Sequence, residues 1–151
     1  MALILLPPSE GKTAAATGPK LKLSSLSFPQ LRPHREKVLS QLIALSQGPQ
    51  SKALATLGLS TKQVAELDHN RNILTSHCAP AWQVYTGVLY SALDAGSLTA
   101  NQLLLLSKST YVQSALFGLV GLSDKIPAYR LSGDCTLPKV GSLTSVWAQP
   151  C

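Results

Sequence analysis

A polar loop that follows an apolar run supplies the side chains in this sequence best suited to chemistry. Residues 3–6 are all apolar, two prolines follow, and after them come Ser9, Glu10, Gly11, Lys12 and Thr13. Proline cannot donate to a sheet ladder and disfavours helical geometry in the residue before it, so residues 3–6 are predicted to form a buried strand ending near Leu6. Ligands often bind where strands end in sheets covered by helices. A solvated turn is an equally good interpretation of the loop.

The order Gly11-Lys12-Thr13 is similar to the end of a phosphate-binding P-loop, but two requirements are missing. Position 6 is leucine where that pattern needs its first glycine, and Gly18-Pro19 comes too early for a following helix. We therefore exclude an ATP-type P-loop. Lys12 can still attract an anion as a point charge.

Arg130 lies between apolar neighbours, where an arginine usually pairs with a carboxylate or with a ligand anion. We expect Lys12 and Arg130 to hold an anionic group in one cleft, with Glu10 as acid or base. Core packing is the competing role for Tyr85. The candidate catalytic residues are Glu10, Lys12 and Tyr129. The candidate ligand-binding residues are Ser9, Glu10, Lys12, Tyr85, Thr86, Tyr129 and Arg130.

The elements that must position these side chains follow from apolar periodicity. Helices are predicted over residues 33–46, 50–57 and 98–106, the last after a Thr99 cap. Residues 80–93 form one long apolar stripe, predicted to be a central helix in which Gly87 needs a special reason. Strands are predicted over 111–117 and 128–131. Helical and strand patterns intermix without a βαβ series, so we expect one α+β domain over residues 1–151, with a mixed sheet packed against several helices.

A glycine turn between two predicted helices suggests a nucleic-acid contact. Leu57-Gly58-Leu59 predicts the end of one helix, and the Ser60 to Gln63 spacing predicts a capping box that opens another over Val64 and Leu67. The pattern resembles a helix-hairpin-helix, in which backbone amides meet a DNA phosphate without reading bases. An ordinary helix-to-helix turn is the alternative. The candidate DNA-binding residues are Lys52, Gly58, Ser60, Thr61 and Lys62.

The net charge of +6 lies in one part of the chain. Residues 1–62 hold eight lysines and arginines against two glutamates, and residues 63–151 hold five cations against five anions. A basic half indicates attraction to a polyanion such as nucleic acid. Surface lysines that merely improve solubility are an equally good explanation.

Metal, cofactor and membrane sites are not predicted. The three histidines and the widely separated Cys78, Cys135 and Cys151 lack metal-ligand or disulfide spacing, so free thiols are expected. Peroxide sensing by Cys78 would need a lowered thiol pKa. No apolar run approaches the ~20 residues that span a bilayer, and no signal peptide is recognised, so we expect a cytoplasmic protein.

Four stretches, in order, resemble the YaaA family of bacterial peroxide stress proteins. They are residues 3–13 with the sequence PPSEGKT, residues 79–90, residues 114–120, and residues 126–132 continuing to Gly141. The resemblance spans almost the whole chain. It implies a cytoplasmic stress protein that binds double-stranded DNA without sequence specificity, through a helix-hairpin-helix, and helps protect it from oxidative damage. The chain departs from the family where Gly121-Leu122-Ser123 stands in place of an arginine-proline pair before Asp124.

The resemblance also bears on length. Members of the family continue well beyond the segment that matches residues 140–147, so this sequence resembles their amino-terminal part. The apolar stripe of residues 81–93 and the strand over 111–117 are expected to be the least covered surfaces. The alternatives to the DNA-binding role are a protein with a small phosphate or nucleotide pocket around Lys12 and Arg130, and a truncated member without function.

Overall fold

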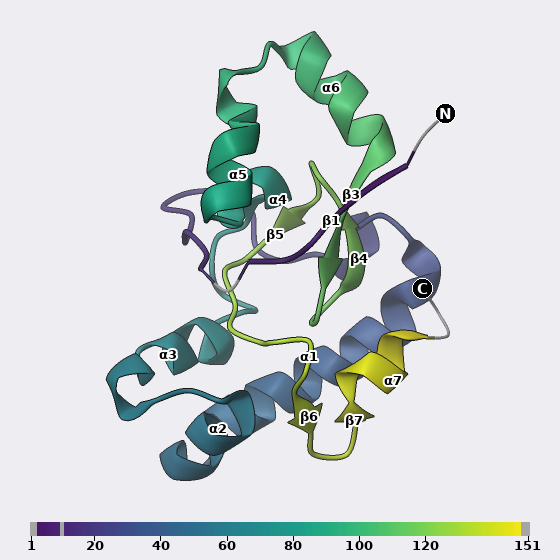
Figure 1. The fold of residues 1–151 in the computed structure, drawn as a ribbon. Helices are drawn as coiled ribbons and strands as arrows, with labels where there is room; N and C mark the ends of the chain where they lie inside the picture. The colour runs from purple at the N-terminus through teal and green to yellow at the C-terminus, as the bar shows by residue number, and fades with distance from the viewer. Residues whose placement is uncertain (1–2, 10, 149–151) are drawn as a thin grey trace.

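The computed structural model describes residues 3–9 and 11–148. At its centre is a mixed sheet of the strands β1 (Ile4–Leu6), β3 (Thr110–Ser114) and β4 (Gly118–Gly121), in the order β1-β3-β4. Strand β1 runs parallel to β3, and β4 runs antiparallel to it (Figure 1). Two short antiparallel ladders join β2 (Ala79–Pro80) to β5 (Lys125–Ile126), and β6 (Thr136–Leu137) to β7 (Gly141–Ser142).

Seven helices accompany this mixed sheet and the two small ladders in the described residues, which confirms the predicted α+β class. In the view of Figure 1, α5 and α6 lie above the sheet, and α1, α2, α3 and α7 lie below it. The helices are α1 (Arg32–Gln47), α2 (Gln50–Leu57), α3 (Glu66–Arg71), α4 (Ala81–Val84), α5 (Val88–Leu93), α6 (Ala100–Ser109) and α7 (Leu143–Ala148).

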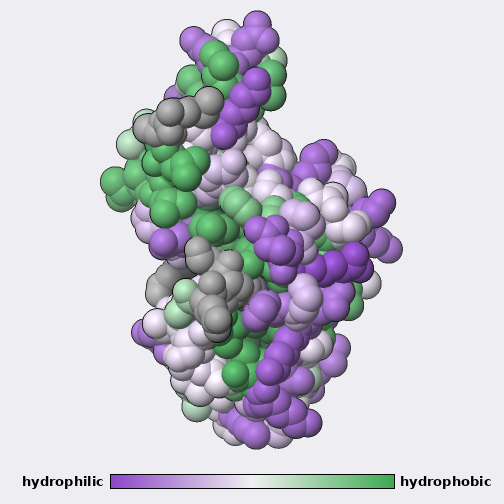
Figure 2. All heavy atoms as spheres, turned by 90° about the vertical axis from the view of Figure 1, so that its right-hand side faces the viewer, coloured by the Kyte–Doolittle hydropathy of each residue, from purple (hydrophilic) through white to green (hydrophobic). Residues whose placement is uncertain are grey.

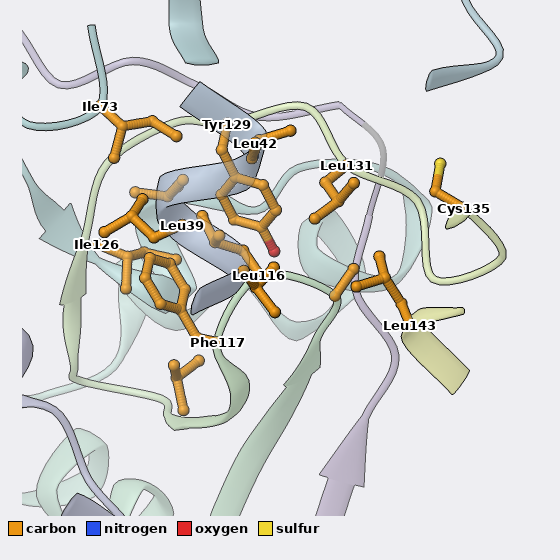
Figure 3. Packing of buried hydrophobic residues seen from close by; sticks show 14 of the residues in the cluster. Leu39, Leu42, Ile73, Leu116, Phe117, Ile126, Tyr129, Leu131, Cys135 and Leu143 are labelled. Carbon is orange, nitrogen blue, oxygen red and sulfur yellow. The ribbon is translucent and has the colours of Figure 1, made fainter. Parts of the chain in front are cut away.

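The core forms where α1 packs against the chain after β3. Leu39 and Leu42 of α1 lie near Phe117, Ile126 and Tyr129 (Figure 3), and all five side chains are buried. Burying leucine and aromatic side chains contributes roughly 1.5–3 kcal/mol each to folding. The apolar periodicity of residues 38–43 therefore correctly predicted the face of α1 that enters the core.

Local signals placed three helices correctly. Helix α1 ends before Gly48-Pro49, and α2 occupies the predicted residues 50–57. Helix α6 begins after Thr99, whose Oγ1 accepts a hydrogen bond from the Gln102 amide at 3.2 Å. The Gln102 side chain in turn accepts one from the Thr99 amide at 2.9 Å, so this cap is a complete capping box.

The single helix predicted over residues 80–93 is wrong. Helix α4 ends at Val84, Tyr85 is extended, and α5 begins only at Val88. The break exists because Lys12 and Tyr85 form an antiparallel β-bridge, while the Thr13 amide donates to the Val84 carbonyl at 2.8 Å. Val88 is consequently 90% exposed, so the apolar stripe does not enter the core as one unit.

The strand predicted over residues 128–131 is also wrong. This segment forms no ladder, and the backbone amide and carbonyl of Arg130 form hydrogen bonds with the buried side chain of Asn70. The Asn70 Oδ1 accepts from the Arg130 amide at 2.8 Å, and its Nδ2 donates to the Arg130 carbonyl at 2.9 Å. The side-chain amide of Asn70 thus supplies the two hydrogen bonds that a neighbouring strand would otherwise give to the backbone of Arg130.

Burial of the strands differs from the prediction in two places. Strand β1 exists, but it lies at the edge of the sheet with Leu3 71% and Leu5 55% exposed, so it is not a buried strand. Residues 111–117, expected to be poorly covered, are largely buried, and Leu116 and Phe117 are fully so. Among the strands of residues 3–9 and 11–148, β1 is therefore the one that leaves large apolar side chains exposed.

Candidate functional site

The loop after β1 lies against the segment that breaks the predicted long helix. Besides the bridge at Lys12, the Thr86 amide donates to the Gly11 carbonyl at 3.3 Å and to Ser9 Oγ at 3.1 Å. Ser9 Oγ donates to the Gly11 carbonyl at 2.7 Å, which fixes the loop against Thr86. Two segments more than 70 residues apart in sequence therefore form one small polar surface.

The Lys12 ammonium lies over the aromatic floor of this surface. Its Nζ donates to the Ser9 carbonyl at 2.8 Å and lies 4.3 Å from the centroid of the Tyr129 ring and 5.6 Å from that of Tyr85. A cation over an aromatic face is stabilised by the ring quadrupole. These contacts hold a half-buried positive charge in one place rather than on a mobile surface chain.

The floor is a chain of buried hydroxyl groups. The Tyr85 and Tyr129 hydroxyls are 2.7 Å apart, Tyr129 is 2.8 Å from Ser114 Oγ, and Ser114 Oγ accepts from the Phe117 amide at 3.0 Å. Burial raises the pKa of both tyrosines above the ordinary phenol value. Both phenols are therefore neutral at physiological pH and can donate or share a proton but do not act as ready bases.

Five of the seven predicted ligand-binding residues are brought together, namely Ser9, Lys12, Tyr85, Thr86 and Tyr129. Glu10 lies outside the described residues. The side chain of Arg130 has its Nη1 4.0 Å from Oε1 of Glu66 in α3, and its backbone pairs with Asn70. The expectation that Lys12 and Arg130 share one anion stays a prediction, since their described contacts involve different elements.

The turn at Gly58 has the local structure that the sequence predicts, but the next helix begins later. Gly58 has a left-handed backbone (φ +69°) at the end of α2, and the Leu59 amide donates to the Leu54 carbonyl. The Ser60 amide donates to Gln63 Oε1 at 3.0 Å in the predicted capping box. A 3₁₀ turn over Thr61–Gln63 follows, and α3 starts only at Glu66, so the helix opening over Val64 was misplaced.

Burial separates this turn into two sides. Leu57, Leu59 and Leu67 are buried and attach it to the core. The five candidate DNA-binding residues are all exposed; they are Lys52, Gly58, Ser60, Thr61 and Lys62. Apolar side chains thus anchor the unit, while its polar side and both lysines face outward.

Two buried polar residues, Asn70 and Arg35, were not singled out from the sequence. Asn70 pairs with the backbone of Arg130. Arg35 is fully buried, with Nε donating to the Phe117 carbonyl at 2.8 Å and Nη2 to the Ser27 and Leu119 carbonyls at 2.6 and 2.7 Å. Its spacing to Val38, Leu39 and Leu42 on one helical face was the signal available in the sequence.

The thiols are poorly suited to sensing peroxide. Cys78 and Cys135 are free and buried, and burial raises the pKa of the Cys78 thiol to about 11. Burial also raises the pKa of Cys135. Because the thiolate is the reactive form, a raised pKa leaves little of it at neutral pH. The third predicted free thiol, Cys151, lies outside the described residues.

Other expected absences concern metals and membranes. Within residues 3–9 and 11–148, histidine, cysteine, aspartate and glutamate nowhere gather in the threes that could bind a metal ion. The helices of this part of the chain are too short or too polar for any of them to cross a bilayer.

The comparisons with known proteins agree on one family. The family model described as peroxide stress protein YaaA matches residues 2–151. The UPF0246 protein SCO2297 of Streptomyces coelicolor is 45% identical over 98% of this chain and 57% of its own length. The UPF0246 protein Cgl1995/cg2186 of Corynebacterium glutamicum is 44% identical over 97% of this chain and 58% of its own length. The chain therefore spans less than two thirds of the length of these curated relatives.

Proposed function

The chain belongs to the peroxide stress protein YaaA family, and on this premise we propose that it acts in the cytoplasm by binding double-stranded DNA without sequence specificity, which helps to shield the DNA during peroxide exposure. The observation that supports the proposal is the turn between α2 and α3. There an exposed backbone turn is followed by the exposed Lys62, and the exposed Lys52 lies on α2, the helix that leads into it.

The geometry of this turn suits a phosphate contact. In the described part of the chain, a side-chain atom at Gly58 would meet nothing within 4 Å, so the turn is open to solvent, while the Gly58, Leu59 and Ser60 amides donate within the chain. Lys62 lies in the 3₁₀ turn that follows and supplies charge, and Lys52 adds a second exposed charge near the start of α2. Such contacts fix a protein on the duplex but carry no sequence information, which predicts affinity indifferent to sequence.

Replacing both lysines with glutamate is expected to weaken binding to a duplex of arbitrary sequence at least about tenfold. The plot of log affinity against log salt concentration should also become shallower, its slope decreasing in magnitude by about 2, because two phosphate contacts are lost. Fluorescence anisotropy over a salt series measures both quantities. The matched control is Lys108→Glu with Lys125→Glu, which changes the net charge equally at two exposed lysines on α6 and β5. Equal losses in the two double variants would contradict the assignment to this turn.

A second candidate function is binding of a small anionic ligand, a phosphate or a nucleotide, beside Lys12. The observation that favours it is that Ser9, Lys12, Tyr85, Thr86 and Tyr129 converge on one surface. The cation of Lys12 is held in place there over the ring of Tyr129, and the buried hydroxyls of Tyr85 and Tyr129 bond to each other beneath it. Glu10 as acid or base and Arg130 as a second cation remain part of this proposal.

Lys12→Gln is expected to weaken binding of inorganic phosphate or ATP at least about tenfold, because the side chain stays polar but loses its charge. Isothermal titration calorimetry measures the affinities, and Lys37→Gln on the exposed side of α1 is the control. Arg130→Gln tests the second cation separately. If neither anion binds the folded chain, the ligand proposal is wrong, whatever the outcome for DNA.

A further inference from the structure

Strand β1 has the composition of an interior strand but lies at an edge. It pairs with β3 on one side, and in the described part of the chain no strand pairs with its other side. Leu3, Ile4 and Leu5 are 71%, 42% and 55% exposed. Successive side chains point to opposite faces of a strand, so apolar groups are uncovered on both faces. Natural edge strands instead carry charges, prolines or bulges that prevent pairing.

A groove continues this uncovered surface. Its volume is about 520 Å³, and its lining includes Leu5, Pro8, Ala115, Leu119, Leu143 and Trp147. The Trp147 indole is fixed by donating Nε1–H to the Ala115 carbonyl at 2.7 Å, so the wall formed by α7 is well defined. Figure 2, which faces the side on which β1 begins, shows hydrophobic side chains gathered on this side of the molecule. The groove runs over one face of the sheet between β4 and α7 and reaches β1 at Leu5, where it meets the open backbone edge.

We propose that the outer edge of β1 and this groove are the docking site for a β-strand with apolar side chains. In relatives of this chain, that strand comes from the part of the polypeptide that lies outside the match to this chain. About two fifths of each relative lies outside that match, which is ample for further strands. Adding a strand would satisfy the outward peptide groups of β1 and place cross-strand side chains beside Ile4 and Leu5 on the two faces of the sheet. The proposal depends on family membership and not on DNA binding.

The first experiment coexpresses this chain with the remaining region of the Streptomyces coelicolor relative as a separate polypeptide. A one-to-one complex is expected, and hydrogen exchange of the β1 amides should slow at least about tenfold on its formation. Leu5→Glu should abolish the complex, whereas Val88→Glu, at a 90% exposed site on α5, should leave it intact. A complex lost equally in both variants would overturn the proposal. A homodimer of this chain that Leu5→Glu dissociates would assign the edge to a second copy instead.

A second experiment does not require the separate region to fold. In the intact Streptomyces relative, amides of the strand that matches β1 should be protected from exchange as strongly as those of the strand that matches β3. In this chain alone, β1 should exchange at least about tenfold faster than β3, because one side of β1 is open. Edge-like exchange of that strand in the intact relative would show that nothing docks there and would reject the proposal.

Discussion

Arg35→Ala is expected to lower the free energy of unfolding by at least about 3 kcal/mol. The guanidinium of this fully buried residue donates to the carbonyls of Ser27, Phe117 and Leu119. Each buried carbonyl that loses its donor costs about 1–3 kcal/mol, and the removed side chain also leaves a cavity. Urea denaturation should show a lower midpoint with little change in slope.

Arg32→Ala is the matched control for this prediction. Arg32 lies on the same helix, but its side chain is 52% exposed and makes a salt bridge with Glu36. Exposed pairs of this spacing contribute about 0.3–0.5 kcal/mol, so the control should remain nearly as stable as the parent. Arg35→Lys should fall between the two, because an ammonium keeps the charge but cannot reproduce the fork of donors. Equal small losses at positions 32 and 35 would show that Arg35 does not organise the chain after β3.

Gly18→Ala is expected to destabilise the fold by about 3 kcal/mol and to lower the melting temperature by roughly 10 °C. A methyl group at this position would lie 2.2 Å from the Cys78 carbonyl oxygen, and the backbone has a φ of +136°. The neighbouring contacts resist relaxation. The Cys78 amide donates to the Pro19 carbonyl at 2.7 Å, and His77 Nδ1 lies 2.7 Å from the Gly18 carbonyl oxygen.

Gly133→Ala separates this effect from a general response to losing a glycine. In the described structure, a methyl group at Gly133 would meet nothing within 4 Å, so the substitution should be neutral or stabilise by up to about 1 kcal/mol. Thermal unfolding followed by circular dichroism compares both variants. A melting temperature for Gly18→Ala within a degree or two of the parent would mean that the close approach to Cys78 is easily relieved.

Several features follow from the sequence alone, because nearby residues decide them. Helices α1 and α2 are bounded by Gly48-Pro49, and the capping boxes at Ser60 and Thr99 form as their spacing predicts. Lys12 and Tyr85 were both named as candidate ligand-binding residues, and the structure brings them together in a β-bridge. That they bind a ligand stays a prediction.

The tertiary structure decided the rest, because the deciding contacts join residues far apart in sequence. The helical stripe of residues 81–93 gives no sign that Lys12 will pair with Tyr85 and break it. The sequence around Arg130 predicts a strand, yet the Asn70 side chain takes the place of the neighbouring strand. The apolar run of β1 predicts burial, but a strand is buried only when something covers it. Whether a partner is present depends on the assembled fold and not on local composition.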